Sequence, residues 1–101
     1  MVHIKKSEYI QISRTILRKL FAEGCFGKGS VYIKVIKSGV AKEDLDKIEL
    51  VLEALIKQNI CGKKKKEHGW KYYLNMDRYD KIMEIIKEKG TKSIIPILLM
   101  L

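Results

Sequence analysis

The sequence predicts an α+β domain, in which three helices are followed by a β-hairpin and one further helix. The length of 101 residues suits a single domain, which buries roughly two-thirds of the surface that its unfolded chain exposes. Apolar residues make up 47% of the chain and charged residues 33%, as is typical of a globular protein. We expect residues 1–6 to form an arm, 7–90 the folded domain, and 91–101 an apolar tail that covers this domain or a neighbouring molecule.

Two segments have the apolar spacing of amphipathic helices. The first begins at Ser7 and ends before Gly24, and its expected buried face holds Tyr9, Ile10, Ser13, Ile16, Leu17, Leu20 and Phe21. Its other face, which we expect to meet solvent or a polyanion, holds Gln11, Arg14, Thr15, Arg18 and Lys19. The second helix spans 42–58 and ends at Asn59, with a stripe of Leu45, Ile48, Val51, Leu52, Leu55 and Ile56.

The segment between these helices is ambiguous. Residues 31–36 are rich in β-branched and aromatic side chains, which suit a strand as well as a helix. We interpret 30–38 as a short helix, because Ser30 can cap its start and Gly39 can end it.

A β-hairpin with a basic tip is predicted after Asn59. The run Lys63 to Lys66 forms the tip, and the strand after it alternates Trp70, Tyr72 and Leu74 with Lys71 and Tyr73. Asp77 can then cap a last helix that ends at Gly90. This order of elements is the plan of a winged helix-turn-helix domain.

The net charge favours a polyanionic partner. The chain has 21 Lys and Arg residues against 12 Asp and Glu, a net charge of +9, which suits nucleic acid or an anionic membrane surface. Since the only arginines are Arg14, Arg18 and Arg78, we expect lysines to neutralise phosphates rather than arginines to read bases. The run Lys63 to Lys66 can follow a phosphate backbone, although a solvated loop would have the same composition.

Aromatic residues next to this run suggest stacking on unpaired bases. However, Trp70, Tyr72 and Leu74 share a strand face, and we interpret them as core at the base of the hairpin. Tyr73 lies on the other face and is the predicted contact.

The helix over 42–58 has an acidic polar face, formed by Glu43, Asp46, Glu49 and Glu53. Such a face is repelled by a DNA groove, which argues against sequence-specific reading of the major groove. It suits a protein partner or plain solvent exposure equally well.

The sequence indicates no enzyme, cofactor, metal site or small-molecule substrate. Cys25, Cys61, His3 and His68 have no metal-binding spacing, and phosphate-loop and nucleophile-elbow motifs are absent. We interpret both cysteines as buried, reduced thiols of an intracellular protein. The apolar end 94–101 is shorter than the roughly 20 residues that cross a bilayer, so no membrane partner is expected.

Several short motifs resemble a known family in the same order along the chain. Leu20-Phe21-Ala22-Glu23-Gly24-Cys25 resembles the Leu-Phe-x-Glu-Gly-Val signature of the eukaryotic-type small-subunit ribosomal protein ten, whose domain also occurs at plectin N termini. Ile4-Lys5-Lys6 is similar to its Ile-Pro-Lys opening, and Leu50 to Cys61 to its third helix. Trp70-Lys71-Tyr72-Tyr73 matches its Trp-x-Tyr-Tyr strand, and Ile94-Ile95-Pro96 its Ile-Val-Pro.

The resemblance implies a divergent winged-helix protein of the small-subunit head, near the beak and the side where messenger RNA enters. It implies a cytoplasmic, non-catalytic protein that binds ribosomal RNA and neighbouring head proteins. Lys5 replaces the family's proline, the aromatic strand is shorter, and the basic Gly/Arg-rich extension is missing. The residues predicted to bind nucleic acid are Lys5, Lys6, Arg14, Arg18, Lys28, Lys63, Lys64, Lys65, Lys66, Lys71 and Tyr73. A DNA-binding regulator and a protein-interaction module are the alternatives.

Overall fold

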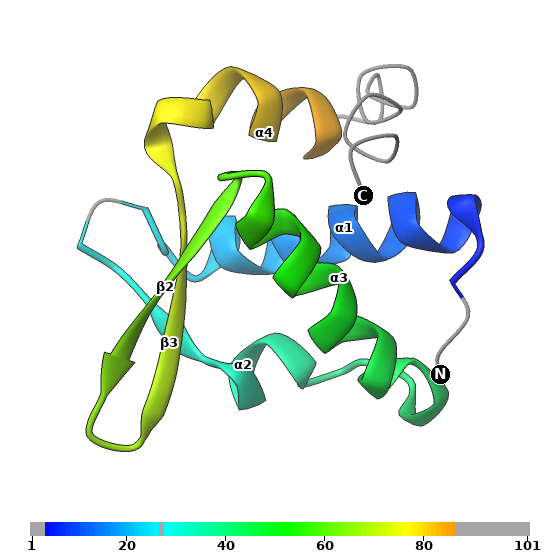
Figure 1. Ribbon diagram of the computed structural model, residues 1–101, viewed down its shortest axis with the longest axis horizontal. Helices are drawn as coiled ribbons and strands as arrows, with labels where there is room; N and C mark the ends of the chain where they lie inside the picture. Colours follow the sequence, from blue (N-terminus) through cyan, green and yellow to red (C-terminus); the bar gives the residue numbers. More distant parts are fainter. Residues whose placement is uncertain (1–3, 27, 87–101) are drawn as a thin grey trace.

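The computed structural model describes residues 4–26 and 28–86, and within them it has the predicted α+β class. The described residues form four α-helices and a three-stranded antiparallel sheet, whose strands are interspersed with the helices along the chain (Figure 1). Their order is α1 (Lys6–Ala22), β1 (Val31–Tyr32), α2 (Ile33–Lys37), α3 (Leu45–Lys57), β2 (Cys61–Lys66), β3 (Gly69–Leu74) and α4 (Tyr79–Ile86). Short 3-10 helices, η1 (Lys42–Asp44) and η2 (Met76–Arg78), precede α3 and α4.

Helix α1 begins at Lys6, one residue before the predicted start. The backbone N–H of Lys5 donates to Oε1 of Glu8 at 3.2 Å, which satisfies a backbone group next to the first turn. Gly24 follows the helix with a φ of 69°, a left-handed conformation that glycine adopts without a steric penalty. The predicted end of this helix is therefore confirmed.

The prediction of one helix over 30–38 is wrong in its first part. Val31 and Tyr32 form β1, opposite Tyr72 and Lys71 of β3, and the helix α2 starts only at Ile33. Ser30 therefore does not cap it. Local propensity is compatible with either a strand or a helix here. Pairing with the free side of β3, which is distant in the sequence, stabilises the strand β1.

The last helix also starts differently from the prediction. Asp77 lies inside η2, the 3-10 helix that leads into α4, and Asn75 caps η2, since its Oδ1 accepts the backbone N–H of Asp77 at 3.1 Å. The Asn75 amide also donates to the carbonyl oxygen of Asn59 at 2.6 Å. Asn59 has a φ of 62°, the left-handed conformation that was predicted at the end of α3. The Asn75 side chain therefore links the end of α3 to the end of the hairpin. The predicted helix end at Gly90 and the tail 91–101 lie outside the described residues.

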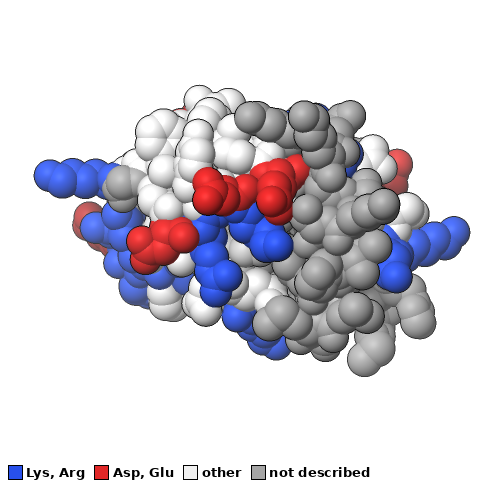
Figure 2. Space-filling model, turned by 90° about the horizontal axis from the view of Figure 1, so that it is seen from above, with Lys and Arg blue, Asp and Glu red and all other residues white. Residues whose placement is uncertain are grey.

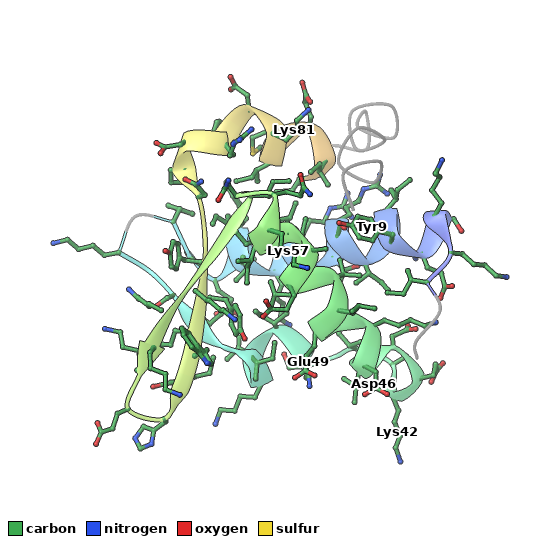
Figure 3. The ribbon with its side chains drawn as sticks, viewed as in Figure 1. Tyr9, Lys42, Asp46, Glu49, Lys57 and Lys81 are labelled. Atoms are coloured by element: carbon green, nitrogen blue, oxygen red, sulfur yellow. The ribbon has the colours of Figure 1, made fainter. Side chains whose placement is uncertain are left out.

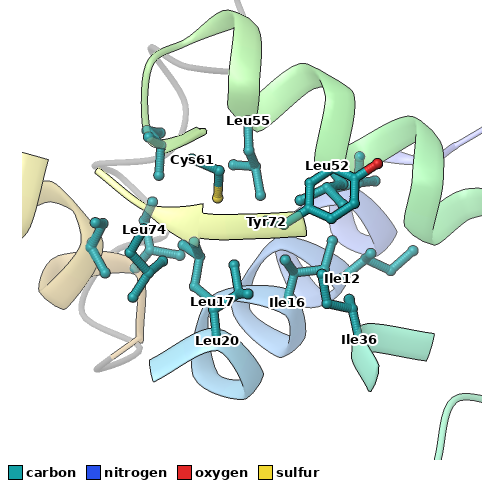
Figure 4. Close-up of a cluster of buried hydrophobic side chains, with 14 of the residues drawn as sticks. Ile12, Ile16, Leu17, Leu20, Ile36, Leu52, Leu55, Cys61, Tyr72 and Leu74 are labelled. Carbon is teal, nitrogen blue, oxygen red and sulfur yellow. The ribbon is translucent and has the colours of Figure 1, made fainter. Parts of the chain in front are cut away.

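The apolar core lies where α1, α3 and β3 meet (Figure 4). The side chains that converge there are Ile16, Leu17 and Leu20 of α1, Leu52 and Leu55 of α3, and Tyr72 and Leu74 of β3. Phe21, which we assigned to the buried face, is 37% exposed, whereas Ile12 is buried. Among the described residues, no helix is both long enough and apolar enough to cross a membrane.

Both cysteines are buried, as predicted, and neither is in a disulfide. Burial raises the pKa of the Cys61 thiol to about 12 and also raises the pKa of Cys25. Both side chains therefore stay protonated at neutral pH and act as small apolar groups of the core.

Candidate nucleic-acid interface

The lysine run lies along a strand and not at the tip of the hairpin. Strand β2 pairs with β3 from Cys61 opposite Leu74 to Lys66 opposite Gly69, so the turn itself consists of Glu67 and His68. The predicted basic tip is therefore wrong in position. Lysine has a low strand propensity and the run has no apolar alternation, so nothing in the local sequence indicates a strand there.

This pairing divides the lysines between two faces, because successive side chains of a strand point to opposite sides. Lys63 and Lys65 share a face with Trp70, which lies opposite Lys65. We call this the Trp70 face. Lys64 and Lys66 point to the opposite side.

Trp70 is 41% exposed, so its assignment to the core is wrong. Tyr72 and Leu74, two and four positions further along the same face, are buried as predicted. The last pair between β1 and β3 joins Tyr32 to Lys71, so Trp70 lies just beyond the three-stranded part of the sheet. Alternation predicted the shared face, but only the length of β1 decides which side chains are covered.

Two ammonium groups lie against the Trp70 ring. Lys63 Nζ is 4.8 Å and Lys65 Nζ is 5.3 Å from the ring centroid, within the range of cation–π contacts. Lys63 Nζ also lies 3.1 Å from Oε1 of Glu53 on α3. The Trp70 face therefore combines an exposed aromatic ring with two cations, of which Lys63 is tied to the helix.

The opposite side is the Tyr73 face, formed by Lys64, Lys66, Lys71 and Tyr73. The Tyr73 ring lies over Gly62, where an added Cβ would be 2.5 Å from the ring carbon Cζ. Lys64 Nζ is 5.8 Å from the centroid of this ring. Tyr73, the predicted aromatic contact, is thus half-buried and has one side of its ring covered by the strand.

Tyr32 of β1 extends the Tyr73 face. Lys71 Nζ lies 5.0 Å from the centroid of the Tyr32 ring, and the His68 ring meets Tyr32 edge-on at 6.5 Å between centroids. Neither Tyr32 nor His68 was predicted to belong to this surface. Their placement depends on the pairing of β1, which local sequence does not reveal.

Arg14 and Arg18 serve an internal contact in the structure. Arg14 Nε donates to the carbonyl oxygen of Ile85 at 3.2 Å, and Arg18 Nη2 donates to that of Ile86 at 2.9 Å. Both acceptors are backbone carbonyls in the last described turn of α4. The two guanidinium groups therefore stabilise the docking of α4 on α1.

The remaining predicted residues lie apart from one another. Lys5 and Lys6 are exposed at the start of α1, at the opposite end of the molecule from the hairpin (Figure 1). Lys28 is exposed in the loop before β1. Among the predicted residues, the structure thus brings together Lys63 to Lys66, Lys71 and Tyr73.

The acidic face of α3 keeps much of its charge accessible. Asp46 and Glu49 lie along the first part of the helix, and Lys57 lies near its other end (Figure 3). Lys37 of α2 contacts Glu49 at 3.0 Å, yet the Glu49 side chain remains 58% exposed. On the face above α4, acidic and basic side chains also lie next to each other (Figure 2). Exposed lysines also occur on other elements, but the hairpin is where five of the predicted binding lysines, Lys63 to Lys66 and Lys71, lie next to one another.

A separate hollow of about 260 Å³ lies between α1 and the turn before α3, lined in part by Glu8, Thr15, Val40 and Asp44. Lys47 forms ion pairs with both Glu8 and Asp44. In the described part of the chain, no group of three or more His, Cys, Asp and Glu side chains is arranged to hold a metal ion.

Comparison of the chain with protein-family models, with curated proteins and with solved structures finds no match. A function for this chain is therefore argued from the geometry and charge of the β2–β3 hairpin.

Proposed function

We propose that the chain is a winged-helix protein of the small ribosomal subunit, with the β2–β3 hairpin as the wing that binds ribosomal RNA. The element order α1, β1, α2, α3, β2, β3 follows the winged-helix plan. One observation supports RNA binding most strongly: lysines occupy both faces of a projecting two-stranded ribbon, beside an exposed tryptophan.

Lysines on both faces allow the ribbon to contact phosphates on two sides at once. Each phosphate that a lysine neutralises releases a condensed cation, so binding by this ribbon depends on salt and not on base sequence. A folded RNA, in which backbones approach each other, offers phosphates to both faces. Ribosomal RNA is a partner of this kind.

The exposed acids of α3 support RNA over duplex DNA as the partner. In a sequence-specific winged-helix regulator this helix enters the major groove, where Asp46 and Glu49 would meet the phosphates. Coulomb repulsion opposes that approach. The same acids suit the basic surface of a neighbouring protein in the subunit head.

A protein-interaction module is the second candidate, favoured by one observation. Leu50 lies on α3 and is 49% exposed, among the acidic side chains of that helix. An exposed apolar side chain with a polar rim is the kind of surface that a protein partner can bury. Association that survives nuclease treatment would favour this candidate.

Sedimentation of cell extracts in high-magnesium gradients tests the proposal. We expect the protein to co-sediment with small subunits in stoichiometric amount, which also places it in the cytoplasm. Nuclease digestion should release it, and replacement of Lys64, Lys65 and Lys66 by Gln should lower its occupancy. Sedimentation apart from small subunits would contradict the proposal.

A further inference from the structure

We propose that Trp70 is a stacking platform for one unpaired base, and that Lys65 and Lys63 contact the phosphates on either side of that nucleotide. This inference rests on the proposed function and narrows it to RNA with a single-stranded segment, such as a loop or a bulge.

The accessibility of the indole ring is the first support. At 41% exposure, Trp70 leaves a large apolar surface in water at the outer end of a strand. Tyr72, on the same face, is buried because β1 pairs with β3 at that position. Neither β1 nor α3 extends far enough to cover Trp70 in the same way. A planar base that stacks on the ring removes this surface from water.

The two ammonium groups are the second support. They lie 4.8 Å and 5.3 Å from the ring centroid, so the phosphates that flank a stacked base come within reach of flexible lysine stems. Lys63 is already 3.1 Å from Glu53, which offsets part of its charge. Lys65 is therefore expected to contribute more to phosphate binding than Lys63.

Stacking on a protein side chain requires an unpaired base. In the interior of a duplex both faces of each base are covered by its neighbours, and the deep major groove of A-form RNA excludes side chains. Trp70 therefore selects single-stranded over duplex RNA, whereas the lysines alone bind both. Tyr73 is less suited to this role because Gly62 covers one side of its ring.

The chain contains a single tryptophan, so its fluorescence reports directly on Trp70. We would titrate the full chain with a single-stranded oligoribonucleotide and, separately, with a blunt RNA duplex of equal length. The single strand should quench the fluorescence strongly and the duplex should not. Trp70→Ala should weaken single-strand binding by roughly 5- to 100-fold and leave duplex binding unchanged, while Trp70→Phe should retain most of the affinity.

Matched variants separate stacking from charge. Tyr79→Ala removes an aromatic side chain of similar exposure, 43%, at the start of α4 and should leave RNA affinity unchanged. Lys65→Gln should reduce the magnitude of the log–log salt slope by about 0.7, whereas Trp70→Ala should leave that slope unchanged. Circular dichroism of each variant verifies that it is folded.

Two results would overturn the inference, and they differ in what they say of the proposed function. Salt-dependent binding of single-stranded RNA without quenching, and with wild-type affinity in Trp70→Ala, would reject the platform and leave RNA binding intact. Failure of the wild-type chain to bind any RNA in dilute buffer would reject both.

Discussion

The β2–β3 hairpin differs in burial and in charge between its inner end, next to the helices, and its outer end, next to the turn. At the inner end, Cys61, Tyr72 and Leu74 are buried against α1 and α3. At the outer end, residues 64–71, lysines surround an exposed Trp70. The change occurs where β1 and α3 stop covering the strands. One pair of strands thus stabilises the fold at one end and is available for binding at the other.

This comparison predicts that stability and RNA binding can be altered separately. Substitutions at the inner end and in the helices should change the free energy of unfolding, because they remove buried apolar surface. Substitutions in residues 64–71 should change RNA affinity instead.

The largest effect on stability is expected in the helical body. Leu17 of α1 is fully buried, and Leu17→Ala should lower the free energy of unfolding by about 2–5 kcal/mol through lost burial and a residual cavity. Urea denaturation followed by circular dichroism measures this loss. A loss below about 1 kcal/mol would mean that α1 is not part of the core.

An intermediate effect is expected at the inner end of the hairpin, on its Tyr73 face. Gly62→Val places its side chain where the Tyr73 ring lies, and the overpacking should cost about 1–3 kcal/mol. In the double variant with Tyr73→Ala, the cost of the valine should be smaller than in the wild-type background. Equal costs in the two backgrounds would show that the ring does not lie over Gly62.

A smaller, pH-dependent effect is expected from Glu8. The hydrogen bond and charge of Lys47 hold the pKa of the Glu8 carboxyl below its ordinary value of 4.5. Since the folded pKa is the lower one, the pair stabilises the fold above pH 4.5, and this contribution is lost as the pH falls through the folded pKa.

Urea titrations of wild type and Glu8→Gln at several pH values test this contribution. The variant should be less stable at neutral pH, and the difference should disappear in strong acid. The effect is small because both side chains are partly exposed, at 31% and 21%. If the difference in the free energy of unfolding between the two proteins is the same at every pH, the ion pair between Glu8 and Lys47 is not its cause.

The smallest effect on stability is expected from the outer lysines. Replacing Lys64, Lys65 and Lys66 together by Gln should change the free energy of unfolding by no more than about 0.5 kcal/mol, since these residues lie outside the core. Thermal unfolding provides the measurement. A much larger loss of stability would show that the lysines stabilise the hairpin itself. It would contradict the view that the outer end contributes to binding and not to stability.

The elements that the sequence predicts well are those specified by neighbouring residues. Helices α1 and α3 follow from apolar spacing over many residues, and the turns at Gly24 and Asn59 follow from residue types that tolerate a left-handed backbone. The alternation of Trp70, Tyr72 and Leu74 with Lys71 and Tyr73 predicted the second strand of the hairpin, but not that the first strand extends through Lys66.

The features that the sequence does not predict depend on distant partners. Strand β1 exists because β3 pairs with it, and the exposure of Trp70 follows from where that pairing ends. Arg14 and Arg18 match the pattern of a polyanion-facing helix, yet both donate to α4, which is far away in the sequence. For the candidate site, the sequence thus predicted the segment and its charge but not which aromatic side chain is accessible.

We propose that Lys64, Lys65 and Lys66 replace the cations around ribosomal RNA. The most direct measurement is the salt dependence of binding to small-subunit ribosomal RNA, compared between the wild-type chain and the variant with Gln at Lys64, Lys65 and Lys66. We predict that the magnitude of the log–log slope falls by about 2, as expected for three lost phosphate contacts. An identical slope and affinity in the two proteins would contradict the claim.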